Sequence, residues 1–226
     1  MGMWKIPSGE ITDLPYLKKI GAFNERVFLS TGMSELKEIQ QAIAILVEAG
    51  TNRHKISILH CNTEYPTPMH DVNLKAMITI RNETGLNVGY SDHTPGIEVP
   101  IAAVAMGARI IEKHFTLDRT LPGPDHRSSL EPGELKQMVS AIRNVEMAMG
   151  NGIKQPSPSE YKNIAVARKS IHLKSDLIAG SVLKEEHLMM KLPGDGISPM
   201  RMTDLLGKKT RRDLAADHKL SMDDFL

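Results

Sequence analysis

The sequence predicts an α/β fold, in which a parallel sheet with crossover helices is followed by a small strand-rich module. Up to residue 150, short apolar runs alternate with helical patterns, which is typical of strands joined by crossover helices. The runs recur roughly every 25 to 30 residues, close to the repeat of a (β/α)8 barrel. A stretch rich in Gly, Pro and Ser then breaks the pattern. We therefore expect a barrel-type domain at residues 1–149, a linker at 150–163 and a small domain at 164–226.

The first domain offers five strand candidates, at residues 3–7, 27–30, 56–61, 87–91 and 109–114. A complete barrel has no open edge, whereas five parallel strands leave two edges with unpaired backbone amides. The pattern thus leaves two alternatives, an open doubly wound sheet or a piece of a barrel.

The sequence pattern also predicts the helices between these strands. We expect one capped by Ser34 and stopped by Gly50, one beginning near Asp71, one at residues 99–106 and one entered at Pro132. In the second domain, turns are predicted at Gly180 and at Pro193 and Gly194. A core of about 60 residues is marginal, so this domain is expected to lean on another surface.

Composition narrows the classes of partner. With 28 Lys and Arg against 27 Asp and Glu, the net charge is +1 and no block of one sign occurs, which argues against nucleic acid and membrane partners. No apolar run approaches the length of a membrane span, and residues 1–5 lack the apolar core of a signal peptide. The single cysteine, Cys61, fits a reducing compartment. We expect a cytoplasmic protein that binds a small molecule.

Polar residues follow the expected strands, where the sites of parallel α/β proteins form. Any one of these residues can serve ordinary turn chemistry, but their recurrence at all five ends predicts a phosphate or carboxylate site. The hydrogen-bond donors are Lys5, Ser8, Ser30, Thr31, Asn62, Thr63, Ser91 and Thr94, and the carboxylates are Glu10 and Glu64.

Two histidines, His93 and His114, end neighbouring strands at equivalent places. Neutral imidazoles together with water and substrate oxygens suit a divalent ion of the Mn, Co or Zn class, so these two are the candidate metal ligands. Other candidates to supplement them are His60, Glu64 and Asp92. In the loop at residues 117–129, Asp125 can orient sugar hydroxyls and Arg127 can meet an anion, although a solvated loop is the alternative.

Read together, the strand ends resemble the sialic acid synthases, the family of N-acetylneuraminate synthase and its legionaminate and pseudaminate relatives. The matching stretches are "WKIPSGE", "STGM", "LHCNTEYPTP", "GYSDHT", "IEKHFTLD" and "GPDH", and the tail from "VARKSI" to "GDGISPM" resembles the family's antifreeze-like (SAF) domain. The resemblance implies part of a TIM barrel, about its last five β/α units, followed by a SAF domain. It also implies condensation of phosphoenolpyruvate with an N-acetylated hexosamine, such as N-acetylmannosamine, and water to give a nonulosonic acid and phosphate.

The resemblance assigns a role to each candidate residue. His93 and His114 would bind a divalent metal, Mn2+ with Mg2+ or Co2+ as alternatives, that polarises the sugar aldehyde. Glu10 would serve in proton transfer and contact the amino sugar. The remaining assignments are Lys5, Ser8, Ser30, Ser91 and either Asn62 or Thr63 for phosphoenolpyruvate, and Tyr65 and Asp125 for the amino sugar. A homodimer with exchanged SAF domains is implied as well.

Two departures from the family pattern matter. The family's first three strands have no counterpart here, so the chain is expected to be a C-terminal fragment with little activity alone. Leu192 stands where many members carry an arginine that reaches the partner's substrate. Two other functions therefore stay open, a non-catalytic carbohydrate-binding or assembly module and a different metal-dependent aldolase.

Overall fold

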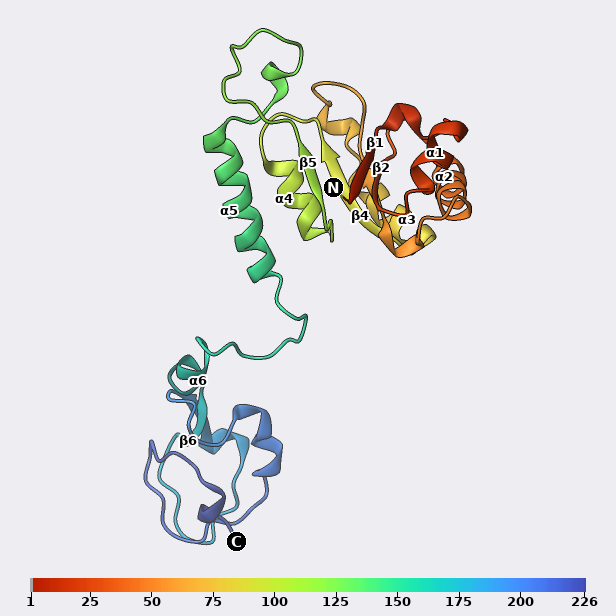
Figure 1. Cartoon of the computed structure of the whole chain (residues 1–226). Helices are drawn as coiled ribbons and strands as arrows, with labels where there is room; N and C mark the ends of the chain where they lie inside the picture. Colours follow the sequence, from red (N-terminus) through yellow and green to blue (C-terminus); the bar gives the residue numbers. More distant parts are fainter. Residues whose placement is uncertain (1) are drawn as a thin grey trace. The chain divides into compact units, whose positions relative to one another are not determined.

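The computed structural model describes residues 2–226 and divides into two compact units, Met1–Gly152 and Ile153–Leu226. Figure 1 traces both units along the chain. The first holds the parallel sheet with its helices, and the second holds the small C-terminal module. Each unit has a hydrophobic core of its own, so each is described separately.

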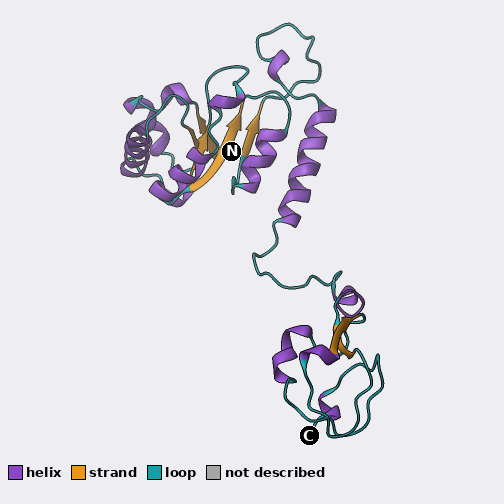
Figure 2. Ribbon diagram, turned by 180° about the vertical axis from the view of Figure 1, so that it is seen from behind, coloured by secondary structure: helices purple, strands orange, loops and turns teal. Residues whose placement is uncertain are grey.

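Five parallel strands form the sheet of the first unit, in the order β1-β2-β3-β4-β5. The sheet is curled, with helices along its convex face, and the prediction of a partial barrel in an α/β fold is confirmed (Figure 2). Its outermost strands, β1 and β5, are each paired on one side only. The strands are β1 (Met3–Ile6), β2 (Arg26–Ser30), β3 (Ile56–His60), β4 (Asn87–Asp92) and β5 (Ile111–Lys113).

The helices of this unit follow their strands in chain order. They are α1 (Leu14–Gly21), α2 (Leu36–Glu48), α3 (Lys75–Thr84), α4 (Glu98–Ala105) and α5 (Pro132–Ala148). Helix α1 was not among the predicted helices, although Asp13 accepts a hydrogen bond from the Tyr16 backbone as its N-cap. The prediction that Ser34 caps α2 was wrong, because Glu35 is the N-cap and forms a capping box with Glu38. The predicted cap is one residue early, because sequence pattern alone does not fix a helix end to a single residue.

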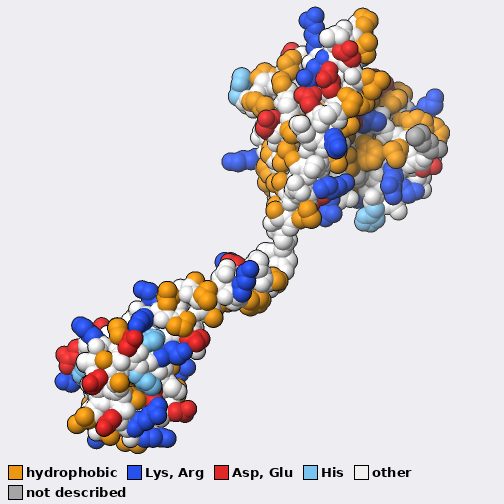
Figure 3. Space-filling model, turned by 90° about the vertical axis from the view of Figure 1, so that its left-hand side faces the viewer, with side chains coloured by type: hydrophobic (Ala, Val, Ile, Leu, Met, Phe, Trp, Pro, Cys, Tyr) orange, Lys and Arg blue, Asp and Glu red, His pale blue; other side chains and the backbone are white. Residues whose placement is uncertain are grey.

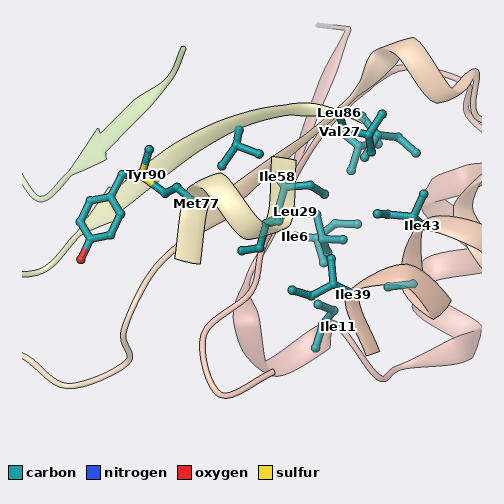
Figure 4. Close-up of a cluster of buried hydrophobic side chains, with 14 of the residues drawn as sticks. Ile6, Ile11, Val27, Leu29, Ile39, Ile43, Ile58, Met77, Leu86 and Tyr90 are labelled. Carbon is teal, nitrogen blue, oxygen red and sulfur yellow. The ribbon is translucent and has the colours of Figure 1, made fainter. Parts of the chain in front are cut away.

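Side chains alternate in direction along each strand, and those on one face form the core between the sheet and the helices. Ile6, Leu29, Ile58 and Tyr90 face the helices and are fully buried (Figure 4). Their neighbours in sequence point to the concave face of the sheet, because side chains alternate along a strand. The polar residues at the strand ends, such as Ser30 and Ser91, belong to this second set.

The second unit is small and built from short elements. Strands β6 (Ser170–Leu173) and β7 (Leu188–Lys191) pair antiparallel, and helix α6 (Tyr161–Ala167) precedes them. Isolated bridges and backbone hydrogen bonds provide most of the remaining order, so the expected strand-rich character is present in short stretches. Its core residues are Ile171, Leu173, Leu183, Ile197, Leu205, Leu214, Leu220 and Phe225.

Short 3-10 helices connect these elements in both units. They are η1 (Ser8–Glu10), η2 (Arg53–Lys55), η3 (Met69–Asp71), η4 (His126–Ser128), η5 (Glu185–His187), η6 (Pro199–Asp204) and η7 (Met222–Asp224). Hydrophobic side chains cover much of the surface of the first unit in the view of Figure 3. Trp4, Phe23, Val139 and Met147 are among the exposed ones. Within residues 2–226, no helix is both long enough and apolar enough to cross a bilayer.

Candidate functional site

A polar cavity of about 200 Å3 lies at the carboxyl ends of the strands, where parallel α/β proteins place their sites. A larger hollow of about 600 Å3 lies at the opposite end of the sheet, beside Phe28 and Ser57. The smaller cavity collects seven of the predicted site residues, and these are Lys5, Ser8, Ser30, Thr63, Tyr65, Ser91 and His93. Its other lining residues are Pro7, Gly9, Met33, Cys61 and Glu112.

Glu112 contacts two of the predicted donors that line the cavity with it. Its Oε1 lies 3.3 Å from Lys5 Nζ and accepts a hydrogen bond of 3.0 Å from Ser91 Oγ. Both charged side chains are partly exposed, at 35% for Lys5 and 43% for Glu112. Because the two charges oppose each other, this pair brings little net positive charge to the cavity.

Ser30 presents a buried hydroxyl to the cavity. The residue is 2% exposed, and within residues 2–226 its Oγ has no hydrogen-bond partner. A buried polar group without a partner costs about 1–3 kcal/mol, so such groups call for an explanation. A bound ligand that accepts a hydrogen bond from this hydroxyl would supply one.

Ser8 is held at the cavity wall by its surroundings. Its Oγ accepts a hydrogen bond of 3.0 Å from the Gly32 backbone and lies 3.2 Å from Cys61 Sγ. Gly32 allows this close approach, because a Cβ there would lie 2.6 Å from Thr63 Cγ2 and 2.9 Å from Ser8 Oγ. The "STG" turn after β2 thus packs directly against the residues of two other strand ends.

The two candidate metal ligands lie beside each other, and His93 lines the cavity whereas His114 does not. The ring centroids of His93 and His114 are 5.5 Å apart, with the ring planes at 81°. Tyr65 stacks on His93 at 4.0 Å and meets His114 edge-on at 5.3 Å. The structure therefore brings the histidine pair together with the tyrosine assigned to the amino sugar.

The hydrogen bonding of His93 fixes which ring nitrogen is free. Its Nδ1 lies 2.6 Å from the Asn62 carbonyl oxygen, which can only accept, so Nδ1 carries the proton and Nε2 keeps its lone pair. Burial lowers the pKa of His93, and the neighbouring His114 lowers it further against the opposing backbone hydrogen bond. A neutral imidazole whose second nitrogen is held by a backbone carbonyl is the usual state of a metal-binding histidine.

Other predicted residues lie at the edge of the site or outside it. The Asn62 side chain accepts a hydrogen bond from the Glu64 backbone and so closes a turn. Asp125 lies in the exposed loop, with Oδ2 at 4.0 Å from His114 Nδ1. Glu10 ends η1 and does not line the cavity. Of the two alternatives for phosphoenolpyruvate, Thr63 rather than Asn62 faces the cavity.

The supplementary metal ligands are not brought to the pair. His60 Nε2 lies 3.1 Å from the carbonyl oxygens of Val72 and Asn73, and Asp92 is bound to Lys113. Within residues 2–226, no group of three or more His, Cys, Asp or Glu side chains is placed to hold a metal ion. The prediction that His60 and Asp92 join the histidines was wrong. His93 and His114 still fit a divalent ion whose remaining ligands are water and substrate oxygens.

Two residues of the site, Glu112 and Gly32, were not predicted from the sequence. Glu112 was read as part of the fifth strand, and only the strand's phase could have shown that it faces the cavity, two residues before His114. Gly32 stood in the quoted "STGM" stretch without a role. A glycine two residues after a strand end, among hydroxyl residues, is the signal that a close approach is needed there.

A curled parallel sheet with donors at its carboxyl ends, joined to a small C-terminal module, defines a barrel-type α/β protein with an appended domain. Comparison with known proteins makes this specific. Residues 1–154 match the NeuB family and residues 168–226 match the SAF domain. The chain belongs to the NeuB family, and the resemblance to the sialic acid synthases is confirmed.

Several relatives cover nearly the whole chain. An N,N'-diacetyllegionaminic acid synthase of Campylobacter jejuni is 52% identical over 95% of this chain and 64% of its own length. The Legionella pneumophila protein of the same name is 45% identical over 94% and 60%. The crystal structure of N-acetylneuraminic acid synthetase from Leptospira borgpetersenii, in complex with citrate, is 37% identical with a TM-score of 0.66, over 73% of this chain and 56% of its own. The chain thus spans less than two thirds of the length of these relatives.

Proposed function

We propose that the chain carries the phosphoenolpyruvate and metal half of a nonulosonic acid synthase, which condenses phosphoenolpyruvate with an N-acetylated amino sugar. The observation that supports this most is the cavity at the strand ends, where six side chains with a hydroxyl or ammonium group surround one space. The unpartnered hydroxyl of Ser30 points to a ligand that accepts hydrogen bonds. The names of the relatives, legionaminic acid synthases among them, agree with this chemistry.

Each donor has a place in this proposal. Lys5, Ser30 and Ser91 bind the phosphate or carboxylate of phosphoenolpyruvate, and Ser8 and Thr63 flank them. Charge-assisted hydrogen bonds of this kind orient the anion in one pose. Tyr65 and Asp125 meet the amino sugar beside the histidine pair. Glu112, within reach of Lys5 and Ser91, is better placed than Glu10 to exchange a proton with a molecule in the cavity.

His93 and His114 would hold a divalent ion, Mn2+ in our proposal, through ring nitrogens. Such an ion acts as a Lewis acid on the sugar aldehyde when bound. The cavity needs added positive charge, because Glu112 offsets Lys5 and the ligand carries several negative charges. An ion held by the two imidazoles would supply this charge, which the hydrogen-bond donors of the cavity do not.

The assembly and location of the protein are further proposals. A homodimer with exchanged SAF domains would give the exposed apolar residues of each unit a partner surface, and light scattering of the purified chain tests it. A cytoplasmic location agrees with the single free thiol of Cys61. Neither proposal affects the assignment of the cavity.

Calorimetric titration tests the proposed function. We expect Mn2+ binding to disappear in His93→Ala and phosphoenolpyruvate binding to weaken strongly in Lys5→Ala, each with unchanged circular dichroism. Ser57→Ala is the matched control, because its hydroxyl lies on the same sheet but beside the hollow at the opposite end. Binding of N-acetylmannosamine that ignores both substitutions, with no binding of phosphoenolpyruvate, would instead identify a carbohydrate-binding module.

A further inference from the structure

Strands β4 and β5 are joined near their carboxyl ends by two side-chain pairs that face opposite ways. Ser91 is in register with Glu112, and Asp92 with Lys113. The first pair lines the cavity, and alternation places the second on the other face of the sheet. The next residue on each strand is a candidate metal ligand. The Asp92–Lys113 pair therefore lies directly before His93 on one strand and His114 on the other.

This second pair is buried, and both of its side chains make further hydrogen bonds to Thr94. Lys113 Nζ lies 2.5 Å from Asp92 Oδ2, with side-chain exposures of 3% and 0%. The same ammonium donates to the Thr94 carbonyl at 2.6 Å, and Asp92 Oδ1 accepts from the Thr94 backbone and hydroxyl at 3.0 and 2.8 Å. Lys113 thus binds the residues on both sides of His93, which are Asp92 and Thr94.

Beyond this pair the two strands separate. The ladder between β4 and β5 ends at Asp92 and Lys113. The carbonyl of His93 accepts a hydrogen bond from the Thr67 backbone, and the carbonyl of His114 accepts one from Leu130. The backbone of each histidine is therefore hydrogen-bonded to a different loop, and Asp92 and Lys113 form the last residue pair of the ladder between the two strands.

We propose that Asp92 and Lys113 are positioning residues that set the separation of His93 and His114 for a shared divalent ion. This inference rests on the proposed metal site. A buried ion pair is weak evidence for stability, because apolar residues of similar volume often replace one without loss. Its geometry is specific, however, and residues that orient metal ligands commonly change metal affinity about 10- to 100-fold when replaced.

The test measures metal binding by the purified chain rather than catalysis. Titration with Mn2+ gives the affinity, and titration with Co2+ gives the visible absorption spectrum, which reports the arrangement of the ligands. The double variant Asp92→Leu/Lys113→Met removes both charges while keeping apolar volume in the core. We expect its Mn2+ affinity to fall about 10- to 100-fold and its Co2+ spectrum to change. Leu46→Ala, a fully buried site on α2, controls for general destabilisation.

The outcomes separate this inference from the proposed metal site. Mn2+ binding that survives His93→Ala refutes the metal site, and the inference with it. Binding that requires His93 but is unchanged in the double variant refutes the positioning role alone. An equal loss in Leu46→Ala would assign the effect to loosened packing and also refute it. If the double variant does not fold, Thr94→Val serves in its place, because it removes one hydrogen bond to Asp92. We expect this variant to bind Mn2+ more weakly, and an unchanged Mn2+ affinity would refute the positioning role.

Discussion

Replacing Ser30 by alanine should weaken ligand binding without weakening the fold. The Ser30 hydroxyl is buried and has no partner within residues 2–226, so its removal relieves a desolvation cost rather than breaking a bond. We expect the free energy of unfolding to stay unchanged or rise by about 1 kcal/mol. A hydrogen bond to a charged ligand contributes about 1.5–3 kcal/mol, so the dissociation constant for phosphoenolpyruvate should rise about 10- to 150-fold.

Two further serines make this result interpretable. Ser91→Ala removes the donor of a 3.0 Å hydrogen bond to Glu112 and should lower the free energy of unfolding by about 1 kcal/mol. Ser57→Ala, at the other end of the sheet, should leave phosphoenolpyruvate binding unchanged. Urea unfolding and calorimetric titration measure the two quantities. A Ser30→Ala variant that loses stability while binding phosphoenolpyruvate as before would refute a ligand-facing role for this hydroxyl.

Two other predictions concern the site wall and the C-terminal unit. Gly32→Ala should cost about 1–3 kcal/mol of stability and weaken phosphoenolpyruvate binding, because the added Cβ overlaps Thr63 and Ser8; Gly133→Ala in α5, with open space around its Cβ, should do neither. Burial raises the pKa of Asp224, but hydrogen bonds from the Ser221 backbone, Arg212 and His218 outweigh it and hold this pKa below its usual range. The carboxylate therefore stabilises the fold above about pH 4, and this stability is lost as the pH falls through the lowered pKa. Scanning calorimetry should show a shallower acid loss in Asp224→Asn, and an identical loss would contradict the linkage.

The positions of the strands and of the histidine pair could be predicted from sequence because both depend on local pattern. Apolar runs mark buried strands, and equivalent ends of neighbouring parallel strands must meet at one edge. The direction and the partner of the Asp92 side chain could not be predicted in this way. It adjoins His93 in sequence, but alternation points it to the opposite face, and its partner Lys113 comes from another strand. Glu112 was missed for the same reason, since one residue of strand phase decides whether a side chain faces the cavity or the core.

We expect the chain, with its open sheet, to bind phosphoenolpyruvate and Mn2+ but to catalyse little or no reaction. The donors Lys5, Ser30 and Ser91 and both histidines lie on strands or strand ends of this chain, so phosphoenolpyruvate and Mn2+ should bind. Catalysis also requires a site that excludes water, because electrostatic stabilisation of the transition state is strongest there. In this chain the sheet has two open edges, at β1 and β5. We therefore expect the purified chain to release little or no phosphate from phosphoenolpyruvate and N-acetylmannosamine at metal and substrate concentrations that saturate binding. Turnover at the rate of a full-length relative assayed in parallel would show that the open sheet already excludes enough water, and would refute this separation.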